Sequence, residues 1–165
     1  MKKLILVRHG RAEDPVPEIS DFERSLTTKG KSISKLIARN LKEKESAMGT
    51  MISSPAFRAL ETAVIFAREY SVDPEKIIMK SNFYYKMNLY YLSEMLATID
   101  NDIELITLFG HNPSISEIVN NLCKQGCHFM PKSGVVVISF NINKWVEIKE
   151  HSGKLEYFLK PENIL

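Results

Sequence analysis

The sequence predicts an α/β protein of three layers, in which helices cover both faces of a mostly parallel central sheet. Short apolar runs alternate with amphipathic stretches over residues 4–122, and the runs end at charged residues, prolines or glycines. This alternation is typical of parallel strands connected by helices. After Pro131, three further apolar runs are joined by turns alone, which predicts antiparallel strands at that edge of the sheet.

The apolar runs in the first two thirds of the chain are expected to be strands buried on both faces, because they show no polar alternation. The later runs are rich in β-branched and aromatic residues, as strands are. The strands are expected at residues 4–7, 50–53, 77–79 and 104–109, and then at residues 135–140, 145–148 and 155–159.

Between these runs, apolar residues recur at helical spacing. Thr27 or Thr28 is expected to cap the first helix, since a threonine hydroxyl can accept a hydrogen bond from a free backbone N–H group. The polar, proline-containing residues 11–23 are expected to form a loop. The expected helices carry the apolar positions between residues 33–41, 59–70, 89–99 and 115–122.

Composition limits the classes of protein and partner. With 165 residues, 44% of them hydrophobic and 25% charged, the chain is expected to form a single domain over residues 1–165. The net charge of +2 gives no indication of nucleic acid as a partner. No stretch approaches the roughly 18–20 apolar residues of a membrane span. Two cysteines suit a reducing cytoplasm and fall short of the roughly four ligands of a zinc site.

Cations and imidazoles follow three of the expected strands. Arg8 and His9 follow the first strand, Arg58 lies three residues after Pro55, and His111 follows the fourth strand. Because the carboxyl ends of parallel strands meet at one edge of a sheet, these side chains are expected to gather there. Two arginines, two histidines and a helix N-terminus would bind a tetrahedral oxyanion such as phosphate.

Each of these residues also has an ordinary explanation when taken alone. Arg58 could be a solvated helix cation, and His111 before Asn-Pro could simply begin a turn. A lone histidine is more often structural than nucleophilic. Their shared position at strand ends is what favours a common anion site.

The motifs around these residues resemble those of the histidine phosphatase superfamily, also called the phosphoglycerate mutase-like or RHG family. Within that family, several further segments are similar to the small phosphohistidine phosphatases of the SixA type, so the resemblance extends over nearly the whole chain. The family motifs are LVRHG at residues 6–10, SSPAFRALETA at residues 53–63 and GHNP at residues 110–113. The SixA-like segments are residues 21–30, residues 131–136, Trp145 and residues 153–161.

The resemblance implies a role for each site residue. His9 is expected to attack phosphorus and form a phosphohistidine intermediate, which divides one displacement into two easier steps. Arg8, Arg58 and His111 are expected to surround the equatorial oxygens, and Arg24 is expected to join them. No metal or other cofactor is implied, because the arginines supply the positive charge.

The source of a proton for the leaving group is where the sequence departs from larger family members. Those proteins carry an acidic residue in a loop or insertion between the second helix and the second histidine. Here that path has no insertion, and Asn82 occupies the place where many relatives have glutamate. Asp21 is the candidate general acid, because it lies close to Arg24, with Glu13 and Asp14 as alternatives.

These expectations describe a cytoplasmic, metal-independent phosphohydrolase, most simply one that dephosphorylates phosphohistidine on a phosphotransfer protein. The P–N bond of phosphohistidine is labile, so a missing acid matters least for this substrate. Two alternatives remain open: a phosphomonoesterase of small phosphoesters, and a non-catalytic phosphate-binding regulatory module. The aromatic residues 83–85 and 90–91 could form a partner-binding rim, although packing in the core is the favoured interpretation.

Overall fold

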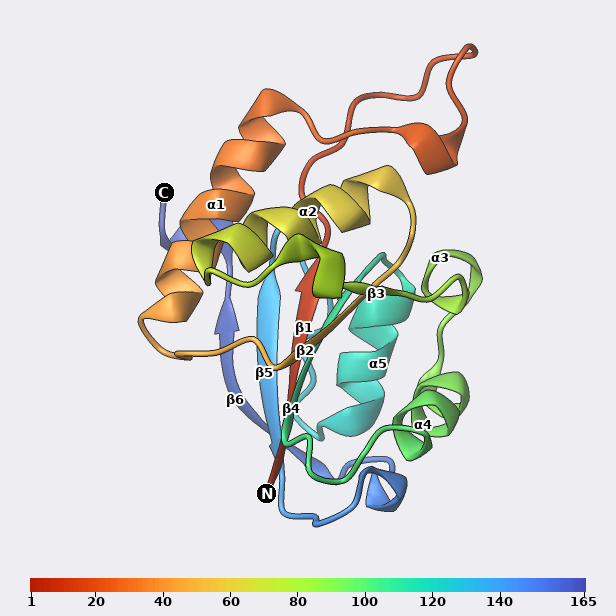
Figure 1. Cartoon of the computed structure of the whole chain (residues 1–165), viewed down its shortest axis with the longest axis vertical. Helices are drawn as coiled ribbons and strands as arrows, with labels where there is room; N and C mark the ends of the chain where they lie inside the picture. Colours follow the sequence, from red (N-terminus) through yellow and green to blue (C-terminus); the bar gives the residue numbers. More distant parts are fainter.

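The computed structural model describes residues 1–165 and contains a six-stranded mixed sheet (Figure 1). Its strands are β1 (Lys2–Arg8), β2 (Thr50–Ser53), β3 (Ile78–Met79), β4 (Leu105–Gly110), β5 (Val135–Phe140) and β6 (Gly153–Leu159). The order across the sheet is β3-β2-β4-β1-β5-β6. The first four strands pair in parallel, and β5 is antiparallel to both β1 and β6. The predicted fold class is therefore confirmed.

Helices cover both faces of this sheet, as Figure 1 shows. On one face lie the two long helices, α1 (Thr28–Lys42) and α2 (Phe57–Glu69). On the other face lie α3 (Asn82–Tyr85), α4 (Leu89–Ala97) and α5 (Ser114–Leu122). Short 3-10 turns complete the chain: η1 (Asp21–Glu23), η2 (Pro74–Lys76), η3 (Trp145–Glu147) and η4 (Pro161–Asn163). None of the helices has the length and apolar character needed to cross a membrane.

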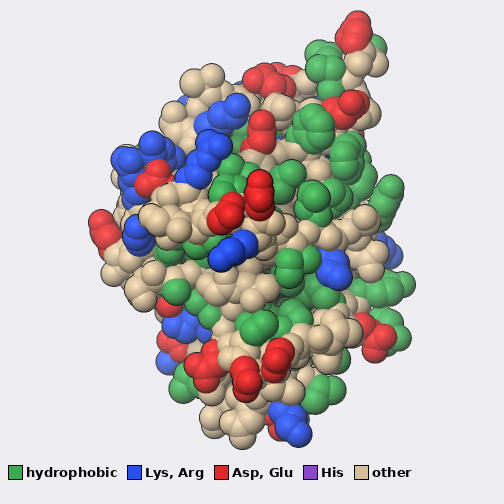
Figure 2. Space-filling model, in the orientation of Figure 1, with side chains coloured by type: hydrophobic (Ala, Val, Ile, Leu, Met, Phe, Trp, Pro, Cys, Tyr) green, Lys and Arg blue, Asp and Glu red, His purple; other side chains and the backbone are tan.

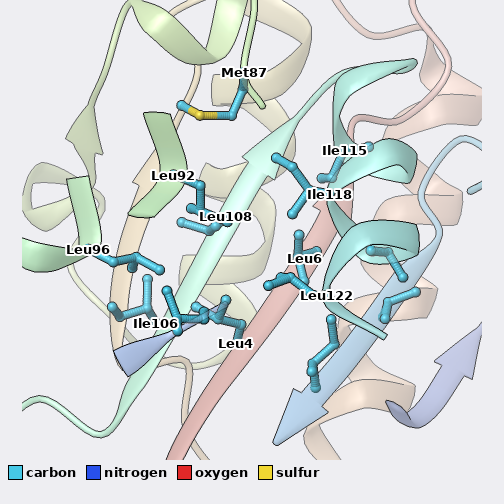
Figure 3. Packing of buried hydrophobic residues seen from close by; sticks show 14 of the residues in the cluster. Leu4, Leu6, Met87, Leu92, Leu96, Ile106, Leu108, Ile115, Ile118 and Leu122 are labelled. Atoms are coloured by element: carbon cyan, nitrogen blue, oxygen red, sulfur yellow. The ribbon is translucent and has the colours of Figure 1, made fainter. Parts of the chain in front are cut away.

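Strand β1 divides the hydrophobic core into two layers, because successive side chains of a strand point to opposite faces. Leu4 and Leu6 belong to the layer beneath α4 and α5, which Figure 3 shows with Ile106 and Leu108 of β4. Ile5 and Val7 belong to the layer beneath α1 and α2. All four β1 side chains are fully buried, as expected of a strand covered on both faces.

Helix α1 begins at the predicted cap. The hydroxyl of Thr27 accepts a hydrogen bond of 2.9 Å from the backbone N–H of Gly30. A Cβ atom added to Gly30 would lie 2.2 Å from the carbonyl oxygen of Arg11. Glycine is therefore required here for the first turn of α1 to pack against the loop that leaves β1.

The strand predicted at residues 145–148 is wrong, since these residues form the turn η3. The Trp145 ring is fully buried, and its Nε1–H donates to the carbonyl of Ile103 at 2.8 Å. The carboxylate of Glu147 accepts from the backbone N–H groups of Asn143 and Lys144, each at 2.9 Å. Burial of the tryptophan and this local cap hold the backbone in a turn.

Candidate active site

His9 directly follows β1 and is held by backbone contacts. Its N–H donates to the carbonyl of Gly110 at 3.1 Å, and its ring Nδ1 lies 2.7 Å from the carbonyl oxygen of Gly10. A carbonyl can only accept, so Nδ1 carries the hydrogen and Nε2 keeps its lone pair. Burial, together with the nearby His111, Arg58 and Arg8, lowers the pKa of His9 to about 3 despite the bond to Gly10. His9 is therefore neutral near pH 7, as a nucleophile must be.

The backbone around His9 is tied to helix α2 through one threonine. The N–H of Gly10 donates to the hydroxyl of Thr62 at 3.0 Å, and that hydroxyl donates to the carbonyl of Arg58 at 2.7 Å. The position of the nucleophile is thus coupled to the helix turn that carries an arginine of the site.

His111 follows β4, and its ring centroid lies 5.0 Å from that of His9. Its Nε2 is 2.8 Å from the hydroxyl of Ser54, which accepts from the N–H of Ala56 at 3.3 Å. The Ser54 hydrogen can then donate to Nε2, which leaves the hydrogen of His111 on Nδ1. Burial, aided by Arg58 and Arg8 against the opposing effect of Asp21, lowers the pKa of His111 to about 4.

Arg8 and Arg58 are both anchored through their terminal nitrogens. Arg8 Nη1 donates to the carbonyl of Met130 at 2.8 Å, and its guanidinium carbon lies 5.0 Å from the ring centre of Phe129. Arg58, in the first turn of α2, donates from Nη1 to the carbonyl of Asp21 at 2.6 Å and from Nη2 to the Asp21 carboxylate at 3.0 Å. The fold thus brings Arg8, His9, Arg58 and His111 to one edge of the sheet.

Three buried nitrogens of this group have no hydrogen-bond partner in the protein: Arg8 Nε, Arg58 Nε and His111 Nδ1. A buried donor without an acceptor costs about 1–3 kcal/mol, so proteins rarely leave one unpaired without a reason. A tetrahedral anion carries several acceptor oxygens and could satisfy all three donors. The donor set therefore fits a phosphoryl group.

Arg24 makes different contacts. Its Nε and Nη2 lie 3.0 and 2.9 Å from Oδ1 of Asp21, and its Nη1 donates to the carbonyl of Glu13 at 2.9 Å. All three of its nitrogens are thus engaged on the loop that follows β1. A contact between Arg24 and phosphate remains a prediction.

Asp21 lies between the two arginines and accepts from the hydroxyl of Tyr84 at 3.2 Å. Partial burial acts to raise the pKa of Asp21, but the hydrogen bonds and charges of Arg58 and then Arg24 outweigh it and lower the pKa below its usual value. A general acid needs a proton at working pH, and this carboxylate is held ionised. The role of Asp21 as an acid stays a prediction that these contacts do not favour.

Three residues at the site were not predicted as site residues: Ser54 and Thr62 were only part of the motif at residues 53–63, and Tyr84 was only part of the aromatic run at residues 83–85. Ser54 follows β2 directly, which is a signal for a site residue, whereas Thr62 lies inside a helix and gave none. The Tyr84 ring packs at 5.9 Å from the His111 ring, although the aromatic run around it was expected in the core.

The family model of the Histidine phosphatase superfamily (branch 1) matches residues 4–78. These residues include the strand that precedes His9 and the helix turn that carries Arg58. This part of the chain is therefore similar to the histidine phosphatase superfamily. An uncharacterized protein of Picosynechococcus sp. is 38% identical over 65 residues, which span only 39% of this chain and 39% of that relative.

Solved structures of similar fold cover almost the whole chain. SixA from Agrobacterium tumefaciens has a TM-score of 0.80 at 23% identity, and the match covers 97% of this chain and 98% of that one. A protein histidine phosphatase SixA complexed with tungstate has a TM-score of 0.79 at 20% identity, with 99% of each chain covered. A mycobacterial glucosyl-3-phosphoglycerate phosphatase with inorganic phosphate has a TM-score of 0.63 at 14% identity, over 95% and 96%. At these identities the likeness shows the fold.

The low pKa of His9 predicts that the protein loses stability in acid. Between the pKa of about 3 in the folded chain and the usual 6.5, the unfolded chain binds a proton that the folded chain does not. The free energy of unfolding should therefore fall as the pH decreases below about 6.5, by roughly 2 kcal/mol at pH 5 for this residue. Urea unfolding at pH 7.5 and pH 5 should show that His9→Ala loses about 2 kcal/mol less than wild type. Equal losses in the two proteins would contradict a buried neutral His9.

Proposed function

We propose that this protein is a phosphatase that works through a phosphohistidine intermediate on His9 and acts on phosphohistidine carried by a phosphotransfer protein. The observation that carries the proposal is the neutral, buried His9, whose Nε2 has a lone pair and whose neighbours include three donors without protein partners. A nucleophile surrounded by donors for oxyanions suits phosphoryl transfer.

In the first step, the lone pair of His9 Nε2 attacks phosphorus as the bond from phosphorus to the leaving nitrogen breaks. The electron pair of that bond stays on the leaving ring. The positive charge that develops on His9 is stabilised because Nδ1–H donates to Gly10. In the second step, a water molecule attacks phosphorus, the new P–N bond breaks, and His9 recovers its lone pair while inorganic phosphate forms.

The positive charge of the site serves the transition state of both steps. Phosphoryl transfer spreads negative charge over three equatorial oxygens, and catalysis is largely positioning and charge stabilisation. Arg8 and Arg58 supply two cations, and His111 supplies a neutral N–H donor. Arg58 lies in the first turn of α2, whose N-terminus adds its own partial positive charge.

The ionised carboxylate of Asp21 favours a substrate with a labile leaving group. The carboxylate is ionised and accepts hydrogen bonds from two arginines, so it has no proton to give. Phosphohistidine does not need one, because its imidazole can already carry a proton on the second ring nitrogen and leave as a neutral ring. An alkyl phosphate would have to leave as a strong base.

The surface beside the site favours a protein substrate. Hydrophobic side chains form a band along the right-hand side of Figure 2, over the loop that follows β1, α3 and α4. The aromatic run of α3 and α4 is only partly in the core: Phe83 is buried, whereas Tyr85, Tyr90 and Tyr91 are 81%, 65% and 46% exposed. We call these three exposed tyrosines the tyrosine rim. Exposed aromatic side chains are typical of protein-binding surfaces.

Two relatives of the same fold carry names that suit this proposal. One is a protein histidine phosphatase complexed with tungstate, a tetrahedral oxyanion, and another is a glucosyl-3-phosphoglycerate phosphatase complexed with inorganic phosphate. The first supports a protein substrate, and both support an oxyanion ligand for a protein of this fold.

The deciding experiment compares phosphate release from a phosphohistidine-bearing phosphotransfer domain, a generic aryl phosphate and a panel of small phosphoesters. Wild type should prefer the phosphoprotein, and His9→Ala should lose turnover and the phosphohistidine label that is trapped by an alkaline quench. His151→Asn is the matched control, because His151 is exposed on a turn far from the site and should keep wild-type rates. Preference for one small ester would instead indicate a metabolite phosphatase, and no turnover on any substrate would indicate a binding module.

Loss of one arginine should slow turnover without abolishing it. A charge-assisted hydrogen bond contributes about 1.5–3 kcal/mol, so Arg8→Ala should lower kcat by about one to two decades. Arg11→Ala removes an exposed arginine three residues away and should change kcat less than about twofold. Steady-state kinetics on a labile small phosphoramidate measures both variants. Equal rates for Arg8→Ala and wild type would exclude Arg8 from the site.

The tyrosine rim should matter only for a protein substrate. Replacing Tyr85, Tyr90 and Tyr91 together by serine should reduce kcat/KM for the phosphoprotein by about tenfold or more, because aromatic contacts carry much of the binding energy at interfaces. The small phosphoramidate should react at the wild-type rate. Leu165→Ser is the control, since Leu165 is 75% exposed and ends the chain on the opposite side of the molecule from α3 and α4. A parallel loss on both substrates would mean that the rim acts on catalysis and not on docking.

A further inference from the structure

The Arg8 side chain is held in the protein by one short segment of the chain. Its Nη1 donates to the carbonyl of Met130 at 2.8 Å, and the ring of Phe129 lies 5.0 Å from its guanidinium carbon. Arg58 is paired with a carboxylate, whereas Arg8 is not. Arg8 Nε is buried and has no partner in the protein. The position of the Met130 carbonyl therefore determines how Arg8 presents its free Nε–H.

Met130 and Phe129 belong to residues 123–131, which lie between α5 and β5 and which we call the α5–β5 segment. We propose that polar side chains along one face of α5 fix this segment and thereby orient Arg8 toward the phosphoryl group. The inference rests on the proposed function only for the identity of the ligand. These positioning residues are Asn112, Ser116 and Asn120.

Two of the positioning residues hold both polar backbone groups of Met130. Its N–H donates to the hydroxyl of Ser116 at 2.9 Å, and its carbonyl accepts from Nδ2 of Asn112 at 3.0 Å. The Ser116 hydroxyl in turn donates to Oδ1 of Asn112 at 2.6 Å. A carbonyl can only accept, so this is the arrangement in which every donor faces an acceptor. The three residues form a closed ring of hydrogen bonds, and the carbonyl that holds Arg8 is part of it.

Asn120 holds an earlier part of the α5–β5 segment. Its Oδ1 accepts from the N–H groups of Cys127 at 2.8 Å and His128 at 3.0 Å, and its Nδ2 donates to the carbonyl of His128 at 3.2 Å. Gly126 packs against the same side chain, since a Cβ atom added there would lie 2.5 Å from Oδ1 of Asn120. The segment is thus fixed on both sides of Phe129.

The sequence places the three positioning residues on one side of the helix. Residues four apart lie above one another on a helix surface, and Asn112, Ser116 and Asn120 follow this spacing through α5 and the turn before it. Ser116 is only 5% exposed. A buried hydroxyl is normally hydrogen-bonded, and this one is paired as both donor and acceptor within the ring.

A fixed arginine suits a phosphoryl group better than a mobile one. A free arginine side chain loses rotamer freedom when it binds an anion, whereas a donor that is already oriented avoids this loss. Preorganised donors also stabilise charge in the transition state without having to move. If the α5–β5 segment shifts, Arg8 keeps its charge but loses its fixed direction, so phosphate should bind less tightly.

A purely structural role for Ser116 predicts a different pattern. If its hydroxyl only stabilised the fold, its loss should weaken phosphate binding to the same extent with and without the Arg8 side chain. If the hydroxyl acts through Arg8, its loss should have little effect once Arg8 has been removed. A double-mutant cycle between the two positions separates these roles.

The test measures the affinity of inorganic phosphate by titration calorimetry for wild type, Ser116→Ala, Arg8→Ala and the double variant. Loss of the hydroxyl should weaken binding by about tenfold in wild type and by less than about twofold in Arg8→Ala. The matched control is Ser93→Ala, because Ser93 is a half-buried helical serine of α4 that bonds only the Leu89 carbonyl; it should bind phosphate as wild type does.

Thermal unfolding of each variant verifies that the fold is intact. If Ser116→Ala does not fold, the same cycle with Asn120→Ala decides the question, because Asn120 is half-buried and holds the segment away from the ring around Met130. The Asn120 cycle should show the same dependence on Arg8.

Unchanged phosphate affinity after loss of the hydroxyl would overturn the positioning role, as would an equal loss with and without Arg8. The proposed function fails separately. If wild type turns over no phosphorylated substrate but the cycle still shows dependence on Arg8, the positioning role stands and the catalytic proposal falls. If wild type binds no phosphate, the positioning role falls too.

Discussion

The parallel pairing of β1 with β4 is the constraint on which the site depends. Its register places Arg8 opposite Gly110, so both strands end at the same level and the next residues, His9 and His111, face each other across 5.0 Å. Parallel strands buried on both faces cannot slip without exposing core side chains, and β1 pairs with neighbours on both sides. The rigidity of the central sheet therefore sets the distance between the two histidines.

Charge balance is the second constraint, and it explains why the site is bordered by a loop. Burial, aided by the charges of Arg58 and Arg8, lowers the pKa of both histidines and keeps them neutral, which preserves the lone pair of His9. The same arginines need anions, and Arg58 is too deeply buried to obtain them from solvent. Asp21 supplies one from the loop after β1, so the charge of Arg58 is balanced at the border of the site.

Much of this could be predicted from sequence, because backbone position determines it. Strand ends can be recognised from apolar runs, and that was enough to bring Arg8, His9, Arg58 and His111 together. The contacts of Asp21 could not be predicted, since they depend on how a polar loop folds back over α2. The turn at Trp145 was missed for a related reason: an apolar run resembles a strand, but burial of a single large ring decided its structure.

The chain between α2 and His111 is short, so it leaves the site uncovered and limits the substrates that the site suits. That path holds only η2, β3, α3, α4 and β4, so no inserted element covers the site, and its border consists of Tyr84 and the loop that carries Asp21. An uncovered site cannot exclude water and offers little room for a desolvated, high-pKa acid. A substrate with a labile P–N bond needs neither the exclusion of water nor such an acid. The protein surface around a phosphorylated histidine can itself cover the site. The missing insertion, the ionised Asp21 and the exposed tyrosine rim are thus consistent with a single kind of substrate.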